Sequence, residues 1–359
     1  MTAIARTVAG RPSPAPPARR RDATGLVRGA AVAGLSFVVT AALFAITPLS
    51  GGFGFVACWY ALFLAGVATD STRVDGPLIA RDKVATIVVT TAGLLTLLPL
   101  VLILGFVVTK GVGALRAGFF THTLEAVGPL DPATAGGAQH AVLGTLQQVA
   151  IAAALSVPLG IATAVYLNEF GGRLAGVVRF FVDAMSGIPS IVAGLFVFAV
   201  WVLQLGRGFS GMAAGLALAV LMLPTVTRTA EEMLRLVPDG LREAALALGA
   251  PHWRTVMRVV LPSARSGLVT AVMLGVARVV GETAPLLLTA FGTDAVNTDP
   301  LHDPQSALPL FVYQQIRNPG ASPIARAWTG ALVLILVVLS LFIVARLIGG
   351  GTRRKRFAS

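Results

Sequence analysis

Hydrophobic residues gather along the chain in eight long runs, separated by shorter segments rich in charged, glycine and proline residues. A run of about 17–25 apolar residues is typical of a membrane-spanning α-helix, because a helix satisfies its own backbone where water is absent. The runs are continuously apolar instead of alternating, which excludes a transmembrane β-barrel. The pattern therefore predicts an all-α polytopic membrane protein. The predicted spans are residues 29–49, 53–69, 84–108, 141–167, 184–205, 211–227, 267–291 and 327–345.

Composition and charge agree with this class. The chain is 55% hydrophobic and 12% charged, whereas a soluble domain has about 25% charged residues. Its net charge of +12 is unevenly placed: with a cytoplasmic N-terminus, the eight spans leave most Lys and Arg residues on the cytoplasmic side. This asymmetry follows the positive-inside rule and predicts a cell-membrane protein with both termini cytoplasmic. Such basic flanks attract anionic membrane lipid and do not indicate nucleic-acid binding.

The pattern also divides the chain into segments. We expect a disordered basic cytoplasmic arm at 1–28, an extra transmembrane hairpin at 29–83, a larger helical unit at 84–348 and a basic cytoplasmic tail at 349–359. Two extracytoplasmic segments of the larger unit, 110–139 and 292–326, are long and rich in turn-forming residues. They are either passive linkers or surfaces that bind a partner.

The sequence shows no sign of ATP hydrolysis or of a metal site. A P-loop needs Gly-Lys-Ser/Thr so that the lysine reaches the phosphates, and none of the lysines, Lys83, Lys110 and Lys355, follows a glycine. The single cysteine, Cys58, and the four histidines have no ligand spacing. We therefore expect a non-enzyme without metal or cofactor, which depends on another polypeptide for any use of ATP.

The stretch EAALALGAPHWRTVMRVVLP, residues 243–262, is amphipathic although it lies between two predicted spans. Asp239 is placed to cap a helix, and Gly249 supplies a left-handed residue at its end. Apolar residues recur at helical spacing after Gly249, and Pro262 is predicted to end the second helix. The pattern predicts two short amphipathic helices joined by a tight turn. Such a unit could lie on the membrane surface or fill a groove in a cytoplasmic partner.

This segment resembles the coupling loop through which permease subunits of ABC importers engage their ATPase. The shared pattern is Glu-Ala-Ala, three residues, glycine, nine residues, a β-branched residue, one residue and Leu-Pro, with Val259 where isoleucine is usual. The resemblance implies a rigid lever at residues 238–262 that receives force from a separate ATPase. The residues it implicates are Glu243, Ala244, Ala245, Gly249, Leu261 and Pro262.

The stretch GVARVVGETAPLLLTA, residues 275–290, carries charges inside the seventh predicted span. Arg278 and Glu282 are predicted to lie one helical turn apart on the same face. A charge at this depth costs about 2.5–3.5 kcal/mol on insertion scales, so it needs a partner or a function. The two residues either form a structural ion pair, or Arg278 faces a translocation path for an oxyanion and Glu282 orients it. At the membrane edge, Asp183 is expected to pair with Arg179.

Several stretches resemble the permease subunits of high-affinity phosphate ABC importers. They are GIPSIVAGLFVF (187–198), LPTVTRTAEEMLRLVPDGLREAALALGA (223–250), ARVVGETAPLLLTA (277–290) and SALPLFVY (306–313). The likeness covers residues 84–346, is strongest from residue 140, and follows the A-type permease in motif order. It implies the six-helix core of type I ABC importers, here with two extra N-terminal helices.

The resemblance also implies partners and a path for inorganic phosphate. The partners are a second homologous permease, two ATPase subunits and an extracytoplasmic phosphate-binding protein. Arg278 is implicated in phosphate passage, and Arg228, near the cytoplasmic end of the sixth span, is a second candidate. The alternative for Arg228 is a positive-inside anchor paired with Glu231 or Glu232.

Two other functions stay open on the sequence alone. A coupling loop would suit an ABC permease for another oxyanion, such as sulfate or molybdate, although the motif from Arg278 to Pro285 favours phosphate. A secondary transporter working alone would need further ion sites within the membrane and no coupling loop.

Overall fold

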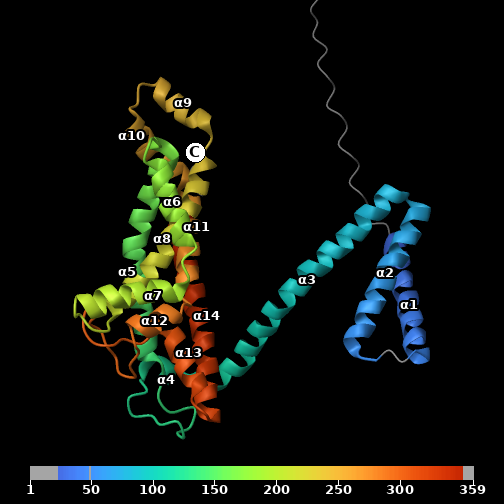
Figure 1. Ribbon diagram of the computed structural model, residues 1–359, viewed down its shortest axis with the longest axis horizontal. Helices are drawn as coiled ribbons and strands as arrows, with labels where there is room; N and C mark the ends of the chain where they lie inside the picture. The colour runs from blue at the N-terminus through green and yellow to red at the C-terminus, as the bar shows by residue number, and fades with distance from the viewer. Residues whose placement is uncertain (1–22, 48–49, 351–359) are drawn as a thin grey trace, which may run out of the picture. The chain divides into compact units, whose positions relative to one another are not determined.

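The computed structural model describes residues 23–47 and 50–350, which are almost entirely helical (Figure 1). Within these residues the sole β contact is an isolated bridge between Phe291 and Gln305. Seven helices are long and apolar enough to cross a membrane, and one further pair is bent. The prediction of an all-α polytopic membrane protein with about eight spans is therefore confirmed. Most of the predicted tail and most of the predicted basic arm lie outside the described residues.

The seven long helices match seven of the eight predicted runs. They are α1 (Ala23–Ile46), α2 (Gly52–Val74), α3 (Pro77–Gly111), α5 (Gln139–Val165), α8 (Gly211–Arg235), α11 (Leu261–Val279) and α14 (Ala321–Gly350). Several extend beyond the predicted limits, because polar residues at the ends of an apolar run continue the helix. Thus α1 begins at Ala23, inside the segment predicted as a disordered arm.

The chain forms two compact units, Met1–Leu102 and Ile103–Ser359. In the first unit α1 and α2 pack as a hairpin, with the indole N–H of Trp59 donating to the carbonyl of Ala33 at 3.1 Å. The division at Leu102 falls within α3, and so does the boundary predicted at residue 83, since α3 runs unbroken from Pro77 to Gly111. Each unit is described by itself below.

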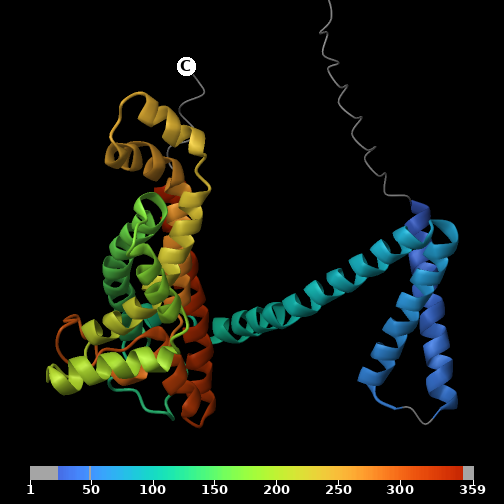
Figure 2. The same ribbon diagram turned by 45° about the horizontal axis from the view of Figure 1, so that its top comes forward.

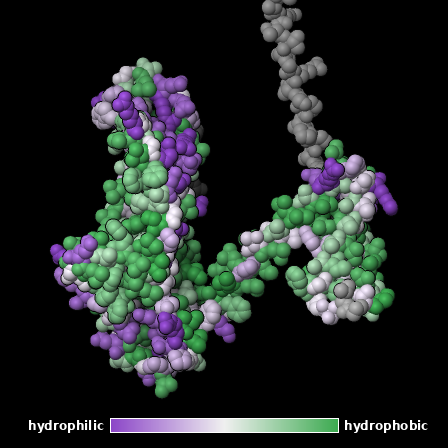
Figure 3. All heavy atoms as spheres, in the orientation of Figure 1, coloured by the Kyte–Doolittle hydropathy of each residue, from purple (hydrophilic) through white to green (hydrophobic). Residues whose placement is uncertain are grey.

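In the second unit α8 is the central helix, packed mainly against α5 and α11. Glycines let these helices approach closely: a Cβ on Gly160 of α5 or on Gly275 of α11 would lie within 3 Å of the Val226 side chain of α8. Small residues at contacts of this kind are typical of helices that pack in a membrane. Figure 3 shows the second unit with a mainly hydrophobic middle and hydrophilic residues gathered toward both ends.

The span predicted at 184–205 is broken near its start. The chain forms α6 (Ala175–Ser186) and then α7 (Ser190–Val197) with the π-helix η3 (Phe198–Gln204), bent by 104°. The break falls at Gly187–Pro189, because a proline disfavours helical geometry in the residue before it. Figures 1 and 2 show α7 lying across the direction of the long helices. It packs against the short α12 (Ala284–Thr289).

The end of the second unit opposite α9 contains the two predicted long connections. They carry short helices: η1 (Val112–Ala114), α4 (Ala117–Thr121) and α13 (Leu308–Arg317). A buried polar network holds the second connection against α5, where the Gln148 amide donates to Gln305 Oε1 and to the carbonyl of Ser306, both at 3.1 Å. The guanidinium of Arg326 on α14 binds carbonyls of the first connection, including that of Asp131 at 3.0 Å. Both connections are therefore fixed to the helical core.

Gly144 of α5 lies where the second connection packs closely against this helix. A Cβ at this position would lie 2.0 Å from the carbonyl oxygen of Ser306. We expect Gly144→Ala to lower stability by about 1–3 kcal/mol or more, because overpacking forces backbone shifts. Thermal unfolding of the purified protein in detergent measures the change. Gly105→Ala is the matched control, since a Cβ on Gly105 meets nothing within 4 Å; equal melting temperatures for the two variants would contradict this packing.

Candidate functional site

Two of the arginines predicted as site residues line one pocket. The pocket has a volume of about 290 Å³ and lies among the end of α6, the middle of α8 and the end of α11. Arg228 comes from α8 and Arg278 from α11, 50 positions apart in the sequence. Ser186, Thr225 and Thr229 add hydroxyl groups to the lining. The pocket therefore offers two guanidinium groups and several hydroxyl groups, and both arginines are exposed at the surface of the second unit.

Arg278 occupies the last turn of α11, and among the described residues its side chain has no ion pair or hydrogen bond. The helix ends at Val279, and Glu282 lies in the break before α12. The predicted placement of Arg278 and Glu282 on one helical face is therefore wrong. Pro285 lies in the first turn of the new helix α12, where its missing N–H needs no partner, so the chain starts a second helix there instead of continuing α11. Glu282 is not part of the pocket lining, which leaves Arg278 without a carboxylate neighbour there.

Arg228 is paired with Asp183 of α6, instead of with a glutamate of its own helix. Arg179 of α6 in turn pairs with Glu231 of α8 at 2.7 Å, and Arg235 bonds the same carboxylate at 2.7 Å. The expected Arg179–Asp183 pair is thus wrong, as is the pairing of Arg228 with Glu231 or Glu232. The observed pairs join α6 to α8 beside the pocket.

The amphipathic segment forms a knob, defined here as residues 238–262, which protrudes at one end of the second unit (Figure 1). It contains α9 (Asp239–Ala247) and α10 (His252–Thr255). The predicted left-handed turn is confirmed: Gly249 has φ of 80°, its N–H bonds the carbonyl of Leu246, and the N–H of Ala250 bonds that of Ala245. These two bonds form a Schellman motif. The predicted cap is wrong, because the Asp239 carboxylate accepts from Arg242 instead.

The outer face of the knob is exposed. Glu243 and Ala244 are exposed and Ala245 is half-buried. Leu248, just before Gly249, has 89% of its surface exposed, and Trp253 has 57%. An exposed apolar face of this kind indicates a protein or membrane contact.

The second helix of the knob does not end at Pro262. Instead α10, the π-helix η4 (Val256–Val260) and α11 form one continuous helical rod, His252–Val279. The π turn changes the hydrogen-bond register just before the proline, so Leu261 and Pro262 enter the first turn of α11. The rod therefore joins the knob directly to Arg278, while α8 joins its other end to Arg228.

Sequence reasoning missed Arg242, which attaches the knob to the bundle. Its guanidinium bonds the carboxylate of Glu169, and this contact raises the pKa of Arg242. The two residues are far apart in the sequence, so no local pattern marks the pair. In the described part of the chain, no group of three or more His, Cys, Asp or Glu residues could hold a metal ion.

Comparison with known proteins agrees with this architecture. The family described as "Binding-protein-dependent transport system inner membrane component" matches residues 156–354, more than half of the chain. The chain belongs to this family, and with its apolar helices it is a multi-pass membrane transport subunit.

Two relatives and one solved structure are similar to this chain over most of their own length. The chain is 47% identical over 279 residues to "Phosphate transport system permease protein PstA 1" of Mycobacterium tuberculosis (strain ATCC 25618 / H37Rv), covering 77% of this chain and 90% of that protein. It is 41% identical to a protein named PstA of Yersinia pestis, over 75% and 90% of the two chains. An inward-facing structure of the MetNI methionine ABC transporter matches 59% of this chain and 94% of its own with a TM-score of 0.50 at 22% identity. That likeness confirms the fold of ABC importer permeases.

Proposed function

We propose that this chain is the transmembrane permease subunit of an ATP-driven phosphate importer. The observation that carries the proposal is the pocket that brings Arg228 and Arg278 together on the two helices leading to the exposed knob. Relatives that this chain covers over most of their length are named phosphate transport permeases, and this supports phosphate as the substrate.

In this function Arg278 binds the anion during passage. A guanidinium donates two parallel hydrogen bonds to the oxygens of a tetrahedral oxyanion. Arg278 is free for this role among the described residues, whereas Asp183 already neutralises part of the charge of Arg228. Glu282 lies beyond the end of α11 and outside the pocket lining, so its predicted role of weakening the grip has no contact in this pocket to support it. A permease must also release its cargo, and the pairing of Arg228 with Asp183 keeps the binding moderate.

The knob couples the pocket to a separate ATPase subunit. Glu243, Ala244 and Ala245 present the slim outer face of α9, and Gly249 allows the sharp turn beneath it. Leu261 and Pro262 begin the rod that ends at Arg278. A push on the knob is therefore transmitted both to α8, which carries Arg228, and to α11, which carries Arg278.

The complete transporter in this proposal contains a second homologous permease and two ATPase subunits, with a phosphate-binding protein on the extracytoplasmic side. Both termini and the knob face the cytoplasm, as the distribution of basic residues predicts. The fixed connections at the opposite end form the surface for the binding protein, because their anchoring to α5 and α14 preserves one shape.

Reconstitution of the complex in proteoliposomes tests the function and its substrate. We expect uptake of labelled phosphate that requires ATP and the binding protein, and that excess sulfate or molybdate does not suppress. Uptake of sulfate or molybdate in preference to phosphate would show that the substrate assignment is wrong, while the chain would still be an ABC importer permease. Transport by this chain alone, without an ATPase, would contradict the proposal.

A further inference from the structure

One arginine, Arg242, holds the base of the knob through hydrogen bonds to several acceptors. Arg242 of α9 donates from Nη2 to Glu169 Oε1 at 2.8 Å and from Nε to Glu169 Oε2 at 3.2 Å. It also donates to the carbonyls of Val237 at 2.6 Å and Leu234 at 3.0 Å. The paired contact with the carboxylate is the geometry in which a guanidinium binds most specifically.

The two acceptor groups belong to different helices of the bundle. Glu169 lies in the π-helix η2 (Tyr166–Phe170), which continues from the end of α5. The carbonyls of Leu234 and Val237 lie at the end of α8, and that of Leu234 also accepts from the backbone N–H of Val237. Arg242 therefore ties the end of α8 to the end of α5.

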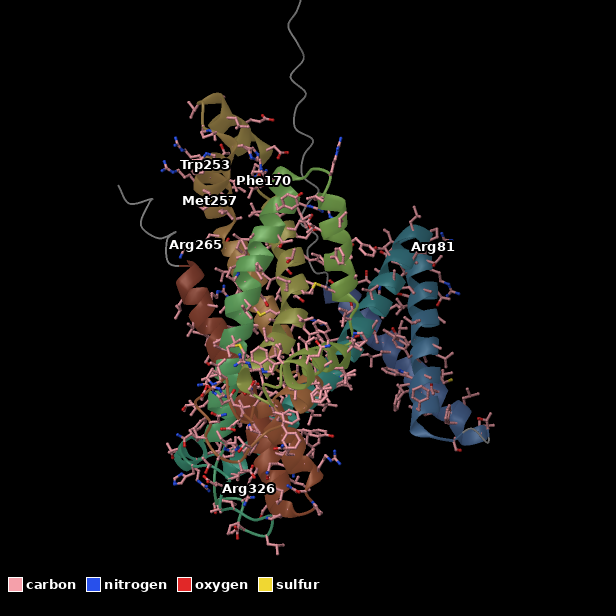
Figure 4. All side chains as sticks on the ribbon, turned by 60° about the vertical axis from the view of Figure 1, so that its left-hand side comes forward. Arg81, Phe170, Trp253, Met257, Arg265 and Arg326 are labelled. Carbon is pink, nitrogen blue, oxygen red and sulfur yellow. The ribbon has the colours of Figure 1, made fainter. Side chains whose placement is uncertain are left out.

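This contact is shielded from water, unlike the outer face of the knob. The Glu169 side chain is 3% exposed and that of Arg242 is 18% exposed. Loss of Arg242 would leave the buried Glu169 carboxylate without a cationic partner among the described residues, and loss of Glu169 would leave Arg242 paired only with the exposed Asp239. A ring contact supports the same attachment, because Phe170 and His252 lie 5.1 Å apart in edge-to-face geometry. Figure 4 shows Phe170 beside the segment that carries Trp253 and Met257.

We propose that Arg242 and Glu169 form a positioning clamp, which makes α9 move as one body with the ends of α5 and α8. This inference rests on the proposed coupling function of the knob. Without the clamp, α9 could turn about its connections at Pro238 and Gly249 when the ATPase presses on it. The push would then be lost before it reached Arg228 on α8, and ATP would be hydrolysed without transport.

The clamp is tested by the number of phosphate ions transported per ATP hydrolysed in the reconstituted complex. We expect Arg242→Gln and Glu169→Gln each to lower this ratio about tenfold. The double variant should be no worse than either single variant, because both remove the same interaction. Arg242→Lys should be intermediate, since lysine keeps the charge but lacks the planar fork.

Arg173→Gln is the matched control, because Arg173 is exposed, close to Glu169 in sequence, and makes no hydrogen bond or ion pair within residues 23–47 and 50–350. It should transport like the wild type. Wild-type ratios in both single variants, or losses that multiply in the double variant, would overturn the clamp. If the single variants fail to assemble, Arg242→Lys decides: an unchanged ratio overturns the clamp and a lowered ratio supports it. Failure of the proposed function can be told apart from failure of the clamp, because the wild-type complex itself would then not take up phosphate.

Discussion

Replacing Arg278 by glutamine is expected to lower ATP-driven phosphate uptake about 10- to 100-fold. The guanidinium lines the pocket and, within the described residues, has no partner that competes with an anion. A hydrogen bond to a charged group contributes about 1.5–3 kcal/mol, and each 1.4 kcal/mol is a factor of ten. Glutamine keeps a donor of similar reach but removes the charge and the fork.

The measurement is uptake of labelled phosphate by proteoliposomes, together with ATP hydrolysis by the same complex. Arg346→Gln is the control, because Arg346 is an exposed arginine of α14 outside the pocket. We expect the Arg278 variant to assemble and the control to transport normally. Uptake at the wild-type rate in Arg278→Gln would show that Arg278 does not act in the translocation path. The assignment of the chain as a permease subunit would still stand.

Replacing Gly249 by aspartate is expected to abolish transport while the complex still assembles. Gly249 has φ of 80°, and a Cβ there meets nothing within 4 Å in the chain. The left-handed backbone costs a side-chain-bearing residue only about 1–2 kcal/mol, and aspartate adopts it more readily than most. The fold therefore survives, but the new carboxylate points into the space where a partner would press against the turn.

Gly206→Asp separates this effect from backbone strain. Gly206 also has a positive φ, of 61°, a Cβ there would likewise meet nothing within 4 Å, and the residue lies outside the knob. Both variants are compared for assembly with the ATPase and for ATP hydrolysis that depends on transport. Normal coupling in Gly249→Asp, or equal loss in both variants, would contradict a contact at Gly249.

Local features of the fold could be read from the sequence because they depend on neighbouring residues. Continuous apolar runs predicted eight spans, of which seven correspond to long helices, and the glycine at position 249 predicted the turn between α9 and α10. Proline was harder to interpret. Pro189 lies at the break between α6 and α7, and Pro285 lies in the first turn of α12, but Pro262 continues a helical rod just after a π turn. Whether a proline breaks a helix depends on the hydrogen-bond register of the turn before it.

Contacts between distant residues were beyond the sequence pattern. Arg228 and Arg278 were each predicted as candidates, but their meeting in one pocket depends on how α8 packs against α11. The pairing of Asp183 with Arg228 and of Glu169 with Arg242 likewise depends on packing between helices. A local rule favours partners three or four residues apart, and here it selected the wrong acid for Arg179.

The most direct test of the account is a crosslink from α9 to the ATPase subunit. Cys58 is the single cysteine of the chain, so a Cys58→Ser background allows one new cysteine at Ala244 or Ala245. Leu130→Cys, at a residue 97% exposed in the connection between α4 and α5, is the control. We predict that both α9 positions crosslink to the ATPase, with a yield that changes on ATP binding, and that the control does not. Absence of any crosslink from α9 in an assembled complex would contradict the account.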